Sequence, residues 1–250
     1  MLTDYSYDKA QRITRDIAAS LESPRFYRDN RDAVARSRHL FQNHPIVQSC
    51  LAIMATYNNP YGHGLSHAEK VAIDSGAIVI IECTNHGNVR RQRLVLLSHL
   101  AGVLHDIKRT APNHALAGAE EARRILPAFD LTEAERNVIP RMIANHEAFQ
   151  PDLPMDTPLD QLLSDALYDA DKFRWGPDNF TEMLWDIIIP KKVPLTKMLT
   201  HFMTGMEGIK KIRHTFRSST GRKYGPEFID LGLHLGAELH AELQKCLNAE

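Results

Sequence analysis

Four histidine and aspartate side chains in the middle of the chain have the residue types of a metal site. They are His67, the adjacent pair His105 and Asp106, and Asp171. The pair stands at the end of a strongly apolar segment, residues 94–104. Burying an imidazole and a carboxylate there costs free energy unless each has a partner. A divalent cation is such a partner, because imidazole nitrogen and carboxylate oxygen both coordinate divalent metals.

Three more histidines accompany this series. His63 precedes His67 by four residues, so the two would share a face if both were helical. The glycines on either side of His63 fit a loop equally well. His114 and His146 lie on or beside predicted helices. Each histidine taken singly is weak evidence for a metal site, because a lone helical histidine is usually solvated or hydrogen-bonded. The ordered series of histidines and aspartates is stronger evidence for such a site.

The segments that hold these residues show helical periodicity, with apolar residues three and four positions apart. Helices are expected over residues 65–82, 94–105, 114–126, 157–168, 178–189, 195–213 and 226–247. Thr132 and Glu135 have the spacing of a capping box that opens another helix, which Pro140 should kink or divide. Thr157 and Pro158 resemble an N-cap followed by proline at the first helical position.

Composition and patterning restrict the class of protein. The 250 residues include 30 basic and 31 acidic side chains, so there is no basic excess for binding nucleic acid. The longest apolar run, residues 77–81, is too short to span a membrane, and the N-terminus lacks a signal-peptide pattern. Cys50, Cys83 and Cys246 form no CxxC pair. We expect a cytoplasmic protein without membrane or nucleic-acid partners, and an oligomer is compatible with the sequence.

No stretch alternates with the period of a strand, so the predicted fold class is all-α. The charged segment of residues 1–50 is expected to form a helical N-terminal extension. Residues 51–190 are expected to form the core that holds the histidines, and residues 191–250 a C-terminal helical part packed on the same domain.

The order H…HD…D resembles the HD-domain superfamily of metal-dependent phosphohydrolases. His63-x3-His67-Ala68 resembles the first-histidine motif, and residues 104–108 (LHDIK) resemble the HD motif itself. Residues 167–173 (LYDADKF) resemble the closing aspartate motif. The resemblance covers about residues 60 to 176 and implies an HD-domain helical bundle.

By this resemblance, His67, His105, Asp106 and Asp171 ligate a divalent ion (Mn, Fe, Co, Ni, Mg or Zn), and Asp106 is able to bridge to a second. His114 and His146 match the second-metal positions. The gap from Asp106 to His114 is shorter than in many two-metal members, which also often have a His-His pair where this chain has Asn145 and His146. The alternative is that both histidines hydrogen-bond phosphate or a metal-bound water.

The implied function is hydrolysis of a small phosphate ester or anhydride, with a nucleotide as the expected substrate, by attack of a metal-bound hydroxide. His63 matches the position of a proton donor in cyclic-nucleotide phosphodiesterases of this fold. Lys108 and Arg109 after the HD pair, and Lys172 and Arg174 after Asp171, are the nearest cations for the phosphate charge. The catalytic candidates are therefore His63, Asp106, Lys108 and Lys172.

Three other functions remain open. A cyclic-nucleotide or cyclic-dinucleotide phosphodiesterase would use the same chemistry, although no Gly-Tyr-Pro motif follows His146. A di-iron oxygenase is a second alternative, because some relatives hold mixed-valent di-iron on a set of six ligands. A non-catalytic module that senses a nucleotide is the third.

Overall fold

The structure, a computed structural model, describes the backbone of residues 2–57 and 64–248, and the side chains of residues 7–57 and 64–247. Within these ranges the chain forms twelve α-helices and no strand, which confirms the predicted all-α class. The first six helices are α1 (Leu2–Ser20), α2 (Arg25–Asp29), α3 (Arg31–Asn43), α4 (Pro45–Met54), α5 (Leu65–Glu82) and α6 (Asn88–Leu104). The others are α7 (His114–Ile125), α8 (Glu133–Ala144), α9 (Pro158–Phe173), α10 (Leu184–Ile188), α11 (Leu195–Ile212) and α12 (Ser219–Asn248). A 3-10 turn (Leu126–Ala128) follows α7, and a π-helical turn (Asn179–Met183) precedes α10.

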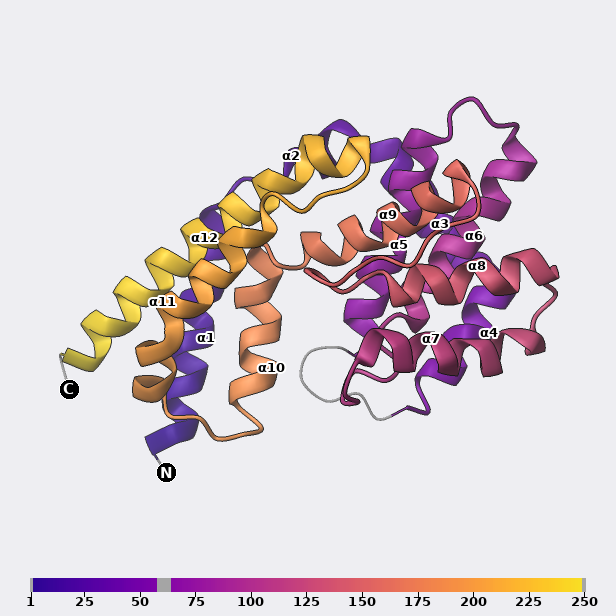
Figure 1. The fold of residues 1–250 in the computed structure, drawn as a ribbon. Helices are drawn as coiled ribbons and strands as arrows, with labels where there is room; N and C mark the ends of the chain where they lie inside the picture. The colour runs from indigo at the N-terminus through magenta and orange to yellow at the C-terminus, as the bar shows by residue number, and fades with distance from the viewer. Residues whose placement is uncertain (1, 58–63, 249–250) are drawn as a thin grey trace.

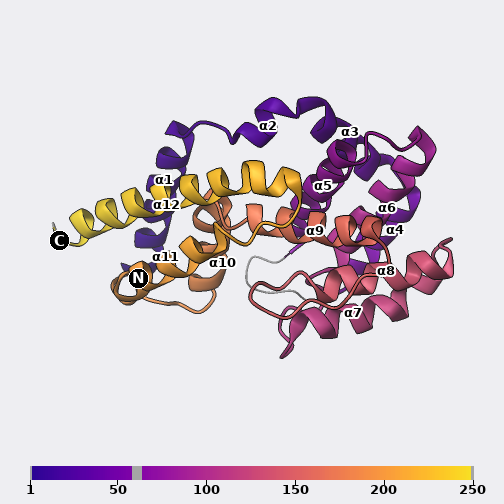
Figure 2. The ribbon, with the colours of Figure 1, turned by 45° about the horizontal axis from the view of Figure 1, so that its top comes forward.

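The helices gather in two groups, one of α3 to α9 and one of α1, α10, α11 and α12 (Figure 1). Helix α12 also packs against α9 and α5, which joins the two groups. The N-terminal α1 lies beside the C-terminal α12, and both termini lie at the same end of the molecule (Figure 2). The Tyr7 hydroxyl donates to the Val193 carbonyl at 2.6 Å. The first fifty residues thus contribute to both groups, since α3 packs on α5.

Helix α5 is the centre of the larger group. Every residue from Val71 to Val79 is buried, which is expected of a helix surrounded by others. Its closest neighbour is α6, and a Cβ placed on Gly102 would lie 2.5 Å from the Ala72 Cα. Glycine at position 102 therefore permits the backbones of α5 and α6 to approach closely.

The predicted helix starts at Thr132 and Thr157 are confirmed. The Thr132 hydroxyl accepts from the Glu135 backbone N–H, and the Glu135 carboxylate accepts from the Thr132 backbone N–H, so the capping box is complete. The Thr157 hydroxyl accepts from the Asp160 backbone N–H, and proline follows at the first position of α9. Helix α9 continues to Phe173, past the expected end at residue 168, so Asp171 lies in its last turn.

Pro140 does not divide its helix, because α8 runs without interruption from Glu133 to Ala144. A proline in a helix removes one backbone hydrogen bond. Here the apolar face around it, with Ile139, Met142 and Ile143, is buried in the core. Burial of that face compensates for the lost bond.

Within the described residues, no helix is long and apolar enough to cross a membrane.

Candidate metal centre

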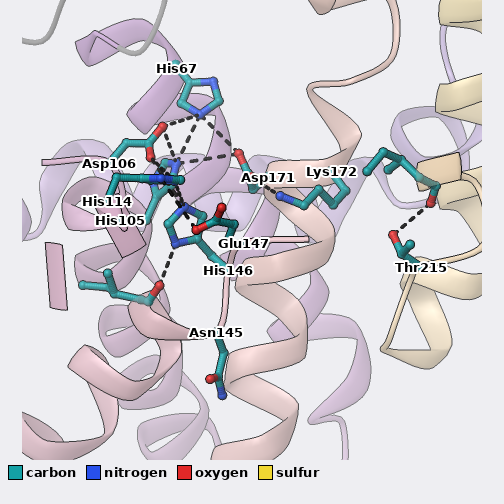
Figure 3. Close-up of polar contacts among 12 residues, drawn as sticks. His67, His105, Asp106, His114, Asn145, His146, Glu147, Asp171, Lys172 and Thr215 are labelled. Atoms are coloured by element: carbon teal, nitrogen blue, oxygen red, sulfur yellow. Dashed lines mark hydrogen bonds and ion pairs between the residues drawn. The ribbon is translucent and has the colours of Figure 1, made fainter. Parts of the chain in front are cut away.

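Four of the predicted ligands converge on one point inside the larger helix group (Figure 3). His67 lies in the first turn of α5, His105 and Asp106 follow the end of α6 directly, and Asp171 lies in the last turn of α9. All four side chains are buried, with at most 6% of each residue exposed. Helix packing of α5 against both α6 and α9 therefore brings together residues up to 104 positions apart in the sequence.

The distances between donor atoms fit a single ion. The Nε2 atom of His67 lies 3.2 Å from Nε2 of His105 and 3.3 Å from Oδ1 of Asp171. Oδ2 of Asp106 lies 3.5 Å from Nε2 of His105 and 3.9 Å from Nε2 of His67. Ligand atoms at about 2.0–2.1 Å from a tetrahedral ion are about 3.3–3.4 Å apart. Two overlapping groups of donor atoms could each hold a metal ion: His67 with His105 and Asp171, and His105 with Asp106 and His146. We call the four predicted ligands His67, His105, Asp106 and Asp171 the first cluster.

A second group of donor atoms adjoins the first and shares Asp106 with it. His114 is the first residue of α7, and His146 follows the end of α8 by two positions. Oδ1 of Asp106 lies 3.4 Å from Nε2 of His146 and 3.6 Å from Nε2 of His114. The two histidine Nε2 atoms are 3.3 Å apart. Asp106, His114 and His146 form the second cluster, so the two oxygens of Asp106 face different histidines.

Backbone carbonyls fix the tautomers of two histidines. Nδ1 of His105 donates to the Gly102 carbonyl at 2.7 Å, and Nδ1 of His146 donates to the Ile143 carbonyl at 2.6 Å. In each case the acceptor is three residues earlier, at the end of the preceding helix. The lone pair of Nε2 consequently points to the cluster, which is the arrangement that metal-binding histidines require. Burial lowers the pKa of His105 to about 3, so its ring is neutral at pH 7.

The carboxylate of Asp171 is ionised. Burial opposes its charge, but the Lys172 ammonium outweighs that effect, together with the imidazoles of His67 and His105, and holds the pKa of Asp171 well below its usual range. Nζ of Lys172 donates to Oδ2 of Asp171, and this lysine is itself buried. An anionic oxygen, Oδ1, therefore remains directed at the histidines.

The two cations that follow Asp106 point in different directions. Nη1 of Arg109 lies 2.6 Å from Nε2 of His114 and 3.7 Å from Oδ1 of Asp106. Nζ of Lys108 instead pairs with Glu121 on α7 at 3.2 Å and lies over the Tyr57 ring. Arg109 thus faces the second cluster, while Lys108 contacts α7.

A cavity of about 330 Å³ opens onto both clusters. Its polar lining residues are His67, Asp106, Arg109, His114, His146, Glu147, Asp171 and Lys172. Its larger apolar lining residues, here called the apolar side, are Phe149, Trp175, Met183 and Ile212. The pocket therefore combines a site for an ion and an anion with a surface for an apolar or ring-shaped group.

Sequence reasoning did not identify the residues of the apolar side. Phe149 lies in a loop with a φ of 64° and is 66% exposed, and no periodic pattern marks such a position. Asn145 does not join the second cluster, because its amide bonds the Leu153 backbone and the Ser164 hydroxyl. The prediction for His63 falls on a residue outside those that the structure describes.

No protein-family model, curated protein or solved structure matches the chain. What the site can do therefore follows from its donor atoms, its distances and its pocket.

Proposed function

We propose that this chain is a metal-dependent phosphohydrolase of the HD type that acts on a small phosphate ester or anhydride, with a nucleotide as the substrate. The observation that carries the proposal is the buried first cluster at the end of an open pocket. Two imidazoles and two carboxylates there would hold a divalent ion, and the two carboxylates would match its charge. A structural site would ordinarily be closed, whereas the pocket leaves room for further ligands on one side.

His67, His105, Asp106 and Asp171 would hold the ion. When bound, such an ion lowers the pKa of a water ligand and neutralises charge on phosphoryl oxygens. The chain's own contribution is to keep His105 in the correct tautomer through the Gly102 carbonyl and to keep Asp171 anionic through Lys172. Both effects fix the donor atoms before substrate binds, which reduces reorganisation during the reaction.

The phosphate would lie between the ion and the two cations of the pocket, Arg109 and Lys172. Both side chains line the cavity, and a guanidinium offers paired N–H donors that suit phosphate oxygens. Lys108 pairs with Glu121 and does not line the cavity. Of the two neighbours Lys108 and Arg109, Arg109 is therefore the better candidate for binding phosphate.

The apolar side of the pocket supports a substrate with a planar or apolar group beside its phosphate. Trp175 and the exposed Phe149 offer aromatic surfaces, and Met183 and Ile212 extend them. Such surfaces suit a nucleobase, which stacks on aromatic rings. Inorganic pyrophosphate would leave this side unused.

A di-iron oxygenase is the second candidate, because His114 and His146 also approach Asp106. The two histidines and the four residues of the first cluster together make a set of six donor residues. Oxygen uptake by iron-loaded protein would distinguish this activity from hydrolysis.

The test is phosphate release from a panel of nucleoside mono-, di- and triphosphates and cyclic nucleotides, each with Mn²⁺, Mg²⁺, Co²⁺ or Ni²⁺. We expect release from at least one ester with at least one ion, and none from the Asp106→Asn variant. If no combination is turned over, the hydrolase is excluded. Tight nucleotide binding without turnover would then favour the sensing module, and conversion of cyclic nucleotides alone would favour the phosphodiesterase.

A further inference from the structure

The second cluster has the geometry of a cation site. Its three donor atoms are Oδ1 of Asp106 and Nε2 of His114 and His146, and they lie 3.3–3.6 Å from one another. This is about the spacing expected around one ion. On donor chemistry alone, the pocket would accept two ions that share the carboxylate of Asp106.

A positively charged side chain of the protein, Arg109, already contacts the second cluster. Nη1 of Arg109 lies 2.6 Å from Nε2 of His114. A guanidinium has only donors, so the Nε2 atom of His114 must accept this hydrogen bond with its lone pair. The same lone pair would be needed to coordinate a metal, so the two interactions exclude each other.

Electrostatics act in the same direction. An ion coordinated by Nε2 of His114 would lie within about 5 Å of Nη1 of Arg109, given ordinary coordination lengths and the 2.6 Å contact. Two cations at that distance repel strongly in a partly buried site. Oδ1 of Asp106, 3.7 Å from the same Nη1, already has a positive neighbour.

The local backbone sets the direction of Arg109. Residues 104–111 form a series of tight turns, in which the N–H groups of Ile107, Arg109 and Ala111 donate to the carbonyls of Leu104, Asp106 and Lys108. This path directs Lys108 toward Glu121 and Arg109 toward His114. The guanidinium is therefore a built-in neighbour of the cluster.

We propose that the Arg109 guanidinium takes the place of a second metal ion, so that the chain binds one divalent ion, in the first cluster. The inference rests on the proposed metal-dependent function and refines it. Asp106 would then help to hold the ion while its Oδ1 atom lies 3.7 Å from Nη1 of Arg109. Arg109 supplies the second positive charge for a phosphoryl group, and the di-iron oxygenase lacks a position for its second iron.

The test counts Mn²⁺ ions bound per chain, by equilibrium dialysis of metal-free protein followed by elemental analysis. We expect one ion in the wild type and two in Arg109→Met, which opens the second cluster. The double variant Arg109→Met/His114→Ala should return to one, because a donor is missing. Arg109→Lys, which keeps a positive charge, should bind one.

Lys108→Met is the matched control, since it removes a neighbouring positive charge that does not face the cluster, and it should bind one ion. Two ions in the wild type would overturn the inference and leave the proposed function intact, and this result needs no variant to fold. One ion in folded Arg109→Met would overturn it as well. Absence of Mn²⁺ from every protein would instead contradict the proposed function, and the inference with it.

Discussion

Arg174 donates a hydrogen bond to the carboxylate of Asp74 across the interface of α9 and α5, and both side chains are buried. Asp74 lies seven residues after His67 on α5, and Arg174 lies three residues after Asp171 at the end of α9. The Tyr27 hydroxyl, from α2, donates to Asp74 and accepts from Arg174, each at 2.7 Å. This buried group therefore links the two helices that supply two of the four candidate ligands.

Asp74→Asn should destabilise the protein on the order of 3 kcal/mol, because it leaves the Arg174 charge buried without its main counter-charge. Asp178→Asn is the control, since Asp178 also pairs with Arg174 but is 28% exposed, and it should cost about 1 kcal/mol or less. Urea unfolding of the metal-free proteins measures both. Equal losses in the two variants would contradict the assigned role of Asp74.

Gly102→Ala should destabilise the protein by about 1–3 kcal/mol, because the new Cβ would lie 2.5 Å from the Ala72 Cα and force α5 and α6 apart. The affinity of the Gly102→Ala variant for a metal ion should fall as well, because a shift of the backbone at residue 102 would move the carbonyl that orients His105. Gly205→Ala is the matched control, because Gly205 is exposed on helix α11 and nothing lies within 4 Å of its Cβ position. It should stabilise the protein by about 0.5–1 kcal/mol. Thermal unfolding that shifts in the same direction for both variants would refute this account of the interface.

His99 should make the protein acid-sensitive. Its ring is buried between α6 and α3, where Nε2 lies 2.9 Å from the Ser37 hydroxyl, and burial, followed by the nearby His44, lowers the pKa of His99 to about 3. Below pH 6.5 the unfolded chain takes up a proton that the folded chain does not, so stability falls as pH decreases from 6.5 toward 3.

Between pH 7.5 and 5.5 the wild type should therefore lose about 1.4 kcal/mol more unfolding free energy than His99→Gln, which has no titrating ring. The comparison between proteins removes the contributions of the other titrating groups. Urea unfolding at the two pH values measures it, and identical losses would show that His99 is not held neutral.

Asp106→Ala should abolish both metal binding and phosphate release, because this carboxylate belongs to both clusters. Asp230→Ala removes a 51% exposed carboxylate that pairs with Arg213 on the surface, and it should retain both properties. Elemental analysis and the phosphate assay are done on the same preparations. A fully loaded Asp106→Ala protein would invalidate the assignment of the ligands.

Local signals in the sequence predicted much of the fold. The limits of α5, the capping box at Thr132 and the start of α9 at Pro158 depend on periodicity and capping, which act within one or two turns. The order and the neighbouring residues of the candidate ligands are distinctive, and the structure places their side chains close to one another.

Relations between distant residues could not be predicted in this way. Asp74 and Arg174 are 100 residues apart, and neither carries a mark of its partner. The pairing of α1 with α12 likewise depends on tertiary packing. Lys108 and Arg109 are chemically similar neighbours, and only the backbone turns after Asp106 decide which of them faces the clusters.

Anomalous X-ray scattering from crystals of Mn²⁺-loaded protein, measured near the manganese absorption edge, shows directly whether one ion lies between the four candidate ligands. We expect a peak about 2.0–2.3 Å from Nε2 of His67, Nε2 of His105, Oδ2 of Asp106 and Oδ1 of Asp171. A peak elsewhere in the molecule, with none between these four residues, would contradict this expectation.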